Sequence, residues 1–120
     1  MNTVPGGAGF IGLGNIGRPM AERLVEWPGG LWVFDVDPAA TDALEKVGAK
    51  VAPSPRELAA HAGVVSVMVR DDEQVRSVVT GPDGLLAGLA TGAVIVIHST
   101  VRPETAAELE LISAPHGVGV

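Results

Sequence analysis

Three glycines near the amino terminus have the spacing with which a backbone can hold a phosphate group. Gly12, Gly14 and Gly17 form the pattern G-x-G-x-x-G directly after a short apolar run. Gly12 permits a tight turn, Gly14 lets the backbone approach a ligand, and Gly17 lets a helix pack closely against a strand. A helix that begins at this loop points free N–H groups and a positive dipole end at the ligand. The pattern predicts a dinucleotide pyrophosphate site, although the same glycines could serve only a tight turn.

An acidic residue downstream supports the dinucleotide interpretation. Asp35 ends a second apolar run, close to the roughly 20 residues that usually separate the glycines from a ribose-binding acid. A carboxylate there accepts hydrogen bonds from ribose hydroxyls and repels a 2′-phosphate, so NAD is favoured over NADP. Asp37 lies two residues further on, and either acid could cap the next helix while the other holds the ribose. Asp35 is the preferred ribose ligand, and residues 36–44 contain no Arg or Lys that could bind a 2′-phosphate.

The chain around these residues alternates between strand and helix patterns. Apolar runs typical of strands cover residues 8–13, 31–36, 49–52, 64–69 and 93–98, and another begins at residues 118–120. Helix patterns cover residues 15–27, 37–47, 54–61, 73–79 and 103–112. This alternation is typical of right-handed βαβ crossovers in a parallel sheet. We predict an α/β fold, a Rossmann-type doubly wound parallel sheet with strand order 3-2-1-4-5-6 and a truncated sixth strand.

The expected helices have an apolar face and polar caps. Residues at helical spacing form the expected buried face of the first helix: Ile16, Met20, Leu24 and Trp27. Polar residues at the expected helix starts are N-cap candidates: Asp37, Ser54, and either Asp71 or Asp72. Residues 1–7 are expected to be a flexible tail, which leaves residues 8–120 as one dinucleotide-binding domain.

Composition narrows the class of protein. The chain has 120 residues, of which 47% are hydrophobic and 18% charged, so it is expected to form one globular domain. It has no cysteine, which excludes disulfides, thiolate metal sites and a cysteine nucleophile. Its net charge of −6 argues against a nucleic-acid or anionic-membrane partner. No transmembrane run or signal peptide is recognisable, so we expect a cytoplasmic protein. No metal site is expected, and the three histidines are assigned no catalytic role.

Residues 12–21, GLGNIGRPMA, resemble the signature of the β-hydroxyacid dehydrogenases, whose best-known member is 3-hydroxyisobutyrate dehydrogenase. The family is related to 6-phosphogluconate dehydrogenase and to imine reductases. Three later blocks continue the resemblance. Residues 34–36, FDV, resemble the second strand of NAD-using members, and residues 68–71, MVRD, resemble the loop after the fourth strand. Residues 97–103, IHSTVRP, resemble the Ser-Thr-x-x-Pro block after the fifth strand.

The resemblance implies roles for individual residues. Together with the glycine loop and the acid, it gives this cofactor-binding set: Gly12, Leu13, Gly14, Asn15, Ile16, Gly17, Asp35, Val36, Val69, Arg70, Gln74 and Thr100. Val69 and Arg70 would border the cofactor, Thr100 would lie near the nicotinamide ribose, and Ser99 would contact the substrate. Arg70 stands where the family usually has Pro, so an ion pair with Asp71 or Asp72 is an equal alternative for it.

The resemblance also implies that the catalytic groups lie outside these residues. In the family, a substrate-binding Asp-Ala-Pro-Val-Ser-Gly-Gly block and a catalytic Lys follow the position of Val120, the Lys in a helical second domain for substrate and dimerisation. The chain would be the NAD-binding domain of an oxidoreductase that transfers hydride between the nicotinamide and a small β-hydroxyacid. It would contain no catalytic residue and be inactive alone. An apolar face left exposed would favour a homo-oligomer.

Two other functions fit the same residues. The chain could be a stand-alone module that senses a dinucleotide, and a coding sequence that stops at Val120 would favour this over the dehydrogenase domain. It could also be an S-adenosylmethionine-dependent methyltransferase domain, which uses a similar glycine loop and acid. That class does not predict the Ser-Thr block at Ser99 and Thr100.

Overall fold

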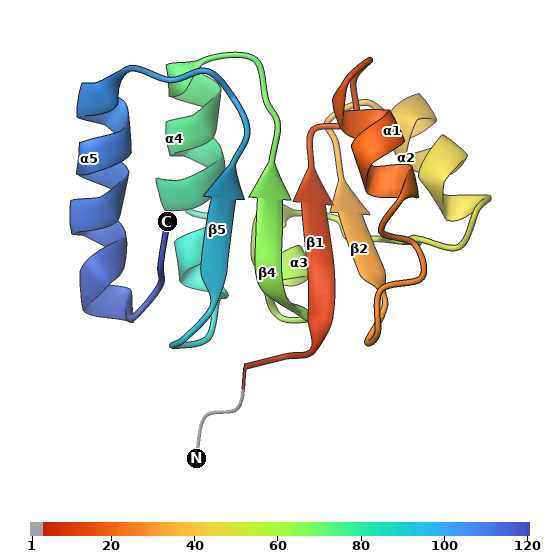
Figure 1. The fold of residues 1–120 in the computed structure, drawn as a ribbon, viewed down its shortest axis with the longest axis horizontal. Coiled ribbons are helices and arrows are strands. Elements are labelled where there is room, and N and C mark those ends of the chain that lie inside the picture. The colour runs from red at the N-terminus through yellow and green to blue at the C-terminus, as the bar shows by residue number, and fades with distance from the viewer. Residues whose placement is uncertain (1–3) are drawn as a thin grey trace.

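The computed structural model describes residues 4–120 as a single parallel sheet with helices on both faces (Figure 1). The strands are β1 (Gly7–Ile11), β2 (Leu31–Phe34), β3 (Lys50–Val51), β4 (Ala62–Val67) and β5 (Val94–Ile97). The helices are α1 (Gly17–Glu22), α2 (Pro38–Glu45), α3 (Pro55–Ala59), α4 (Asp72–Thr80) and α5 (Pro103–Ser113), with short 3₁₀ helices η1 (Leu85–Ala87) and η2 (Ala114–His116). The strand order β3-β2-β1-β4-β5 confirms the predicted topology.

Beyond β5, the chain forms only the start of a sixth strand. Gly119 forms an isolated parallel bridge with Val94 beside β5. The Ile95 N–H donates to the Gly119 carbonyl over 2.8 Å, and the Gly119 N–H donates to the Ala93 carbonyl over 3.0 Å. The position beyond β5 is the one predicted for the truncated strand.

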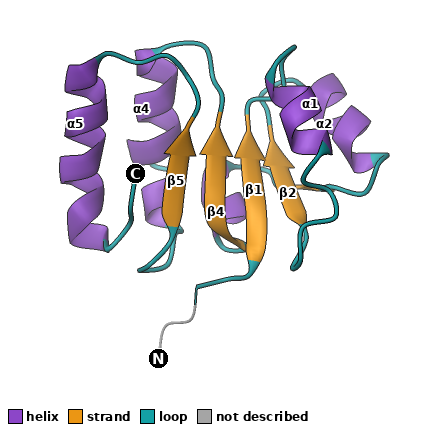
Figure 2. Ribbon diagram, viewed as in Figure 1, coloured by secondary structure: helices purple, strands orange, loops and turns teal. Residues whose placement is uncertain are grey.

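The sheet separates two apolar cores, as a doubly wound fold requires. Phe10 of β1 packs in one core with Val33 and Leu44, on the face covered by α1 and α2. The next residue, Ile11, packs on the opposite face with Val67 and with residues of α3, α4 and α5. Figure 2 shows α1 and α2 over the β1–β2 end of the sheet, and α4 and α5 at the β5 end.

One part of the sheet surface stays open to solvent. Val94 and Val96 on β5 are 40% and 37% exposed. This is the kind of apolar face expected from the sequence, and the self-association that it would favour stays a prediction. Among residues 4–120, no helix has both the length and the apolar character needed to cross a membrane.

The first helix is shorter than predicted, and its buried face is different. It covers Gly17–Glu22 instead of residues 15–27. Ile16 is 67% exposed on the loop before the helix, and Trp27 is 39% exposed, so the predicted apolar stripe is wrong at both ends. The residues that α1 buries are Gly17 and Ala21, because the helix approaches the sheet so closely that only small side chains fit.

The helix caps and the amino-terminal segment refine the other expectations. The side chains of Asp37, Ser54 and Asp71 each accept a hydrogen bond from a backbone N–H in the first turn, so Asp71 rather than Asp72 caps α4. Of the expected tail at residues 1–7, Gly7 is the first residue of β1, and the Gly6 carbonyl accepts from the Trp27 Nε1–H over 3.1 Å. Residues 1–3 of that tail lie outside the described residues.

Candidate cofactor site

The carboxyl ends of β1, β2 and β4 open into a cleft of about 900 Å³. Ligands of doubly wound sheets bind at this edge, where the strand order reverses. The predicted residues that line the cleft are Gly12, Leu13, Gly14, Asn15, Ile16, Gly17, Asp35, Val36, Val69, Arg70 and Gln74. Ser99 and Thr100 are not part of its lining. The structure therefore brings most of the predicted set around one cavity.

The three glycines meet different surroundings. A Cβ added at Gly12, where φ is +95°, would lie 2.0 Å from the Met68 carbonyl oxygen. A Cβ added at Gly17 would lie 2.0 Å from the Gly12 carbonyl oxygen. Among residues 4–120, a Cβ added at Gly14 would have no neighbour within 4 Å. Packing within the fold therefore explains Gly12 and Gly17, whereas Gly14 borders open space and lines the cleft.

The loop between the glycines presents unused hydrogen-bond donors. The Gly12 N–H donates to the Phe34 carbonyl over 3.2 Å, and the Leu13 N–H donates to the Asp35 carboxylate. In the part of the chain that the structure describes, the N–H groups of Asn15 and Ile16 have no partner. Backbone donors that face a cleft without a partner suit an anionic ligand such as a pyrophosphate.

The two acids after β2 have distinct contacts. Asp35 accepts hydrogen bonds from the Leu13 N–H over 2.7 Å and from the Asp37 N–H over 2.8 Å. Its carboxylate thus joins the glycine loop to the turn before α2. Asp37 caps α2 by accepting from the Ala39 N–H over 3.0 Å. Of the two acids that the sequence offers as the cap of α2, Asp37 is the cap. Both acids line the cleft.

Arg70 and Gln74 lie on the opposite wall of the cleft. The Arg70 N–H donates to Gln74 Oε1 over 2.8 Å, and the Gln74 N–H donates to the Asp71 carboxylate over 2.9 Å. Within residues 4–120, the Arg70 guanidinium forms no ion pair, so the alternative pairing with Asp71 or Asp72 is not formed. The Arg70 side chain is exposed at the rim, where it is available to a ligand.

Ser99 contacts the backbone of the neighbouring loop. Its hydroxyl donates to the Val69 carbonyl over 2.7 Å and accepts from the Val69 N–H over 2.8 Å. Thr100, the next residue, is exposed. The described residues contain no cluster of three His, Asp or Glu side chains that could hold a metal ion.

One further wall of the cleft is not indicated by any motif in the sequence. That wall comes from α3, from α4 and from the turn after it, and consists of Pro55, Ser77, Val78, Gly81, Pro82 and Asp83. These residues form no motif, because they meet only when α4 packs against the sheet. The one signal available in the sequence was the turn pattern at residues 81–84, which marks a loop but not its position.

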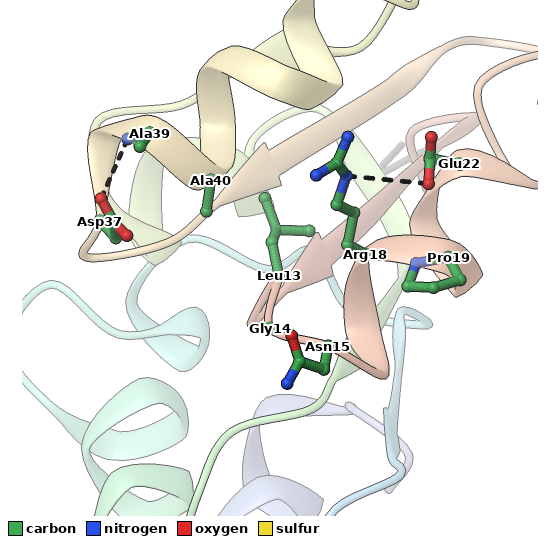
Figure 3. A pocket seen from close by; sticks show the side chains of 9 residues that line it. All are labelled: Leu13, Gly14, Asn15, Arg18, Pro19, Glu22, Asp37, Ala39 and Ala40. Atoms are coloured by element: carbon green, nitrogen blue, oxygen red, sulfur yellow. Dashed lines mark hydrogen bonds and ion pairs between the residues drawn. The ribbon is translucent and has the colours of Figure 1, made fainter.

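A second cavity, of about 630 Å³, adjoins the cleft at the glycine loop (Figure 3). Its lining includes residues of α1 and α2, among them Arg18 and Glu22, whose side chains lie 3.8 Å apart as an i,i+4 ion pair. The residues that it shares with the cleft are Leu13, Gly14, Asn15, Asp37 and Ala40. The two cavities therefore meet at the glycine loop and at the start of α2.

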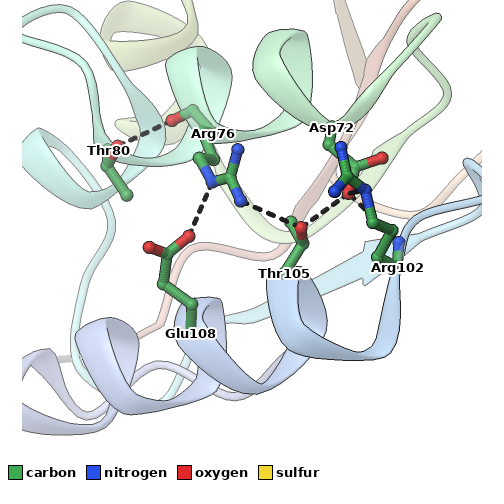
Figure 4. Close-up of polar contacts among 6 residues, drawn as sticks. All are labelled: Asp72, Arg76, Thr80, Arg102, Thr105 and Glu108. Atoms are coloured by element: carbon green, nitrogen blue, oxygen red, sulfur yellow. Dashed lines mark hydrogen bonds and ion pairs between the residues drawn. The ribbon is translucent and has the colours of Figure 1, made fainter.

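A polar network joins the first two turns of α4 and α5 (Figure 4). The Asp72 carboxylate accepts from the Thr105 hydroxyl over 2.6 Å and from the Arg102 N–H over 3.1 Å. Arg76 donates to Thr105 over 3.0 Å and pairs with Glu108 over 2.6 Å. The hydrogen bond from Thr105 and then that from Arg102 lower the pKa of Asp72 below its ordinary value of 3.8, and the pair with Glu108 raises the pKa of Arg76.

The Asp72 contacts predict a dependence of stability on pH. A carboxyl group whose folded pKa is depressed stabilises the protein above its unfolded pKa and loses that effect as pH falls through the folded value. We expect the difference in free energy of unfolding between wild type and Asp72→Asn to be constant near neutral pH and to shrink below about pH 4. Urea unfolding from pH 7 down to pH 2.5 measures this. A difference that is the same at both ends of the range would contradict it.

Comparisons with known proteins agree with this geometry. Residues 7–120 match the family described as the NAD binding domain of 6-phosphogluconate dehydrogenase. An uncharacterized oxidoreductase of Mycobacterium tuberculosis is 44% identical over 112 residues, which are 93% of this chain and 38% of the relative. The chain therefore spans well under half of the length of the curated relatives that it resembles.

Two solved structures show the same fold. That of Mycobacterium tuberculosis 3-hydroxyisobutyrate dehydrogenase with L-serine has a TM-score of 0.83 at 30% identity, covering 96% of this chain and 38% of the other. That of Psf3 in complex with NADP⁺ and 2-OPP has a TM-score of 0.85 at 35% identity, covering 93% and 40%.

Proposed function

Because the chain belongs to the family of the NAD-binding domain of 6-phosphogluconate dehydrogenase, we propose that it binds NAD as the cofactor half of an oxidoreductase acting on a small β-hydroxyacid. The observation that carries the proposal is the shared cleft: unpartnered loop N–H groups and the Asp35 carboxylate line the same cavity. The family match decides against a methyltransferase domain. It leaves the stand-alone sensor as the alternative, because a sensor would use the same cleft.

The residues present fit a dinucleotide. The open space in front of Gly14 admits a group that lies directly on the backbone. The free N–H groups of Asn15 and Ile16 would bind the negative charge of the pyrophosphate. Asp35, whose oxygens already accept two backbone N–H groups, retains lone pairs that would accept from the ribose hydroxyls. Each part of the ligand would thus meet a group of matching chemistry.

NAD rather than NADP is proposed as the cofactor. Asp35 and Asp37 line the cleft together, and their negative charges would repel a 2′-phosphate. The segment that follows them carries no compensating cation through residue 44. Psf3 was solved with NADP⁺, so the fold by itself does not select NAD, and the two acids are the feature that would favour NAD here.

The role of this chain in the reaction would be to bind and orient. The nicotinamide, when bound, supplies hydride chemistry toward the carbinol carbon of the substrate. Asn15, Ile16 and Asp35 would fix the pyrophosphate and the ribose, while Val69, Arg70 and Gln74 would border the cofactor from the opposite wall and Thr100 would lie near the nicotinamide end. The groups that move the hydroxyl proton would belong to a second domain, so residues 1–120 alone would be inactive.

The choice between the two acids gives a prediction for the cofactor. Asp35→Ala is expected to weaken NADH binding by about 10- to 100-fold, because hydrogen bonds to a charged group contribute about 1.5–3 kcal/mol. Asp37→Ala is expected to cost about 1 kcal/mol of stability through loss of the α2 cap, with a smaller effect on affinity. Fluorescence titration of NADH and NADPH against the wild type and both variants measures this.

Three other outcomes of that titration would contradict the proposed cofactor, the proposed ribose ligand or the proposed site. Tighter binding of NADPH than of NADH by the wild type would contradict the NAD assignment. A larger loss of affinity in Asp37→Ala would transfer the ribose contact to Asp37. If neither nucleotide binds to the folded wild type, the proposed site itself is wrong.

A further inference from the structure

We propose that Ser99 is a positioning residue that holds the backbone of Val69 at the edge of the cofactor cleft. The inference rests on the proposed function for its consequence, but its structural basis is independent of any ligand. It differs from the substrate contact implied for Ser99 by the family resemblance.

The contact replaces backbone pairing where the strands have ended. The last β4–β5 backbone bond runs from the His98 N–H to the Val67 carbonyl over 2.9 Å. Beyond it, the Ser99 hydroxyl alone bonds both polar groups of Val69, donating over 2.7 Å and accepting over 2.8 Å. One side chain therefore satisfies both the N–H and the C=O of a residue 30 positions away. This pairing extends the sheet as far as the cleft.

The position of Val69 matters because the glycine loop rests against the same segment. The Met68 N–H donates to the Ile11 carbonyl over 2.8 Å, on the side of β1. A Cβ added at Gly12 would lie 2.0 Å from the Met68 carbonyl oxygen and 3.3 Å from Val69 Cγ1. The Met68–Val69 peptide is thus confined between Gly12 on one side and Ser99 on the other. A shift of Val69 would change the wall of the cleft opposite the glycine loop.

The same geometry leaves Ser99 little capacity for a substrate. A serine hydroxyl has one proton to donate, and that proton is directed at the Val69 carbonyl. Ser99 is half-buried and does not line the cleft, whereas Val69 does. The effect of Ser99 on the ligand would therefore pass through Val69.

Hydrogen exchange at the Val69 amide tests the contact without any ligand. In Ser99→Ala, we expect exchange at this amide to accelerate at least about tenfold relative to the wild type, since its one acceptor is gone. Ser66→Ala is the matched control, because Ser66 lies within β4 and the side chain that bonds Val69 is that of Ser99, so exchange at Val69 should not change. Ser99→Thr, which keeps the hydroxyl, should restore protection. Unchanged exchange at Val69 in Ser99→Ala would overturn the proposal.

NADH affinity then tests the consequence. At a temperature where every variant is folded, Ser99→Ala should raise the NADH dissociation constant about tenfold, with Ser66→Ala and Ser99→Thr within twofold of wild type. A folded Ser99→Ala protein that binds NADH as the wild type does would overturn the positioning role. Ser99→Cys, of similar size but with a weak donor, replaces Ser99→Ala if the latter does not fold. Failure of the wild type to bind NADH would contradict the proposed function, and the exchange experiment would still decide the contact.

Discussion

Gly14→Ala is expected to fold as the wild type does and to lose tight binding of NADH. The added methyl group would have no neighbour within 4 Å, and φ at Gly14 lies outside the left-handed region, so the folded chain accepts it without strain. The same methyl group would stand where a pyrophosphate must approach the backbone. The proposed hydrogen bonds from the Asn15 and Ile16 N–H groups to the pyrophosphate would be lost. Loss of two such charge-assisted bonds would raise the dissociation constant of NADH on the order of 100-fold. NADH titration together with a thermal melt measures both effects.

Gly6→Ala is the matched control for Gly14→Ala. Among the described residues, a Cβ at Gly6 also has no neighbour within 4 Å, and Gly6 precedes β1 at the opposite edge of the sheet from the cleft. This variant should keep both the melting temperature and the affinity of the wild type. If Gly14→Ala binds NADH as tightly as Gly6→Ala does, the pyrophosphate does not lie on the glycine loop.

Much of the cleft could be predicted from the sequence because its key groups are local. Gly12, Gly14 and Gly17 lie close together in the sequence, and their spacing is typical of a strand, a loop and a helix in succession. Asp35 follows at the end of the next strand, which pairs directly with β1. In a parallel sheet, adjacent strands end at the same edge, so the acid had to lie beside the glycines.

Contacts between distant segments could not be predicted in the same way. The bond between Ser99 and Val69 depends on how the chain leaves two different strands, and no periodicity encodes that. The first helix differs from its sequence pattern for a related reason. Ile16 has the right spacing for a buried face, but the close approach of Gly17 to Gly12 sets the orientation of α1 and leaves Ile16 in solvent. The close packing of α1 against the glycine loop, and not the spacing of apolar residues, therefore decides which residues this helix buries.

Gly12→Ala is expected to destabilise the fold severely. The added Cβ would lie 2.0 Å from the Met68 carbonyl oxygen at a backbone φ of +95°, so both a clash with backbone and conformational strain arise. Strain at such a φ costs about 1–3 kcal/mol, and a clash that only strand movement can relieve brings the total above about 4 kcal/mol. Domains of this size are stable by about 5–15 kcal/mol, so this loss removes a large share of the margin. Urea unfolding, or circular dichroism if no folded baseline remains, measures it.

Two other glycines separate the causes of that loss. At Gly48, φ is +116° and an added Cβ meets nothing within 4 Å, so Gly48→Ala should show the strain alone, about 1–3 kcal/mol. At Gly17, φ lies outside the left-handed region but the Cβ would lie 2.0 Å from the Gly12 carbonyl oxygen, so Gly17→Ala should show the clash alone. The loss in Gly12→Ala should exceed that in either variant. A loss no greater than that of Gly48→Ala would mean that the Met68 peptide can move away from the glycine loop, and the confinement of Val69 between Gly12 and Ser99 would then be wrong.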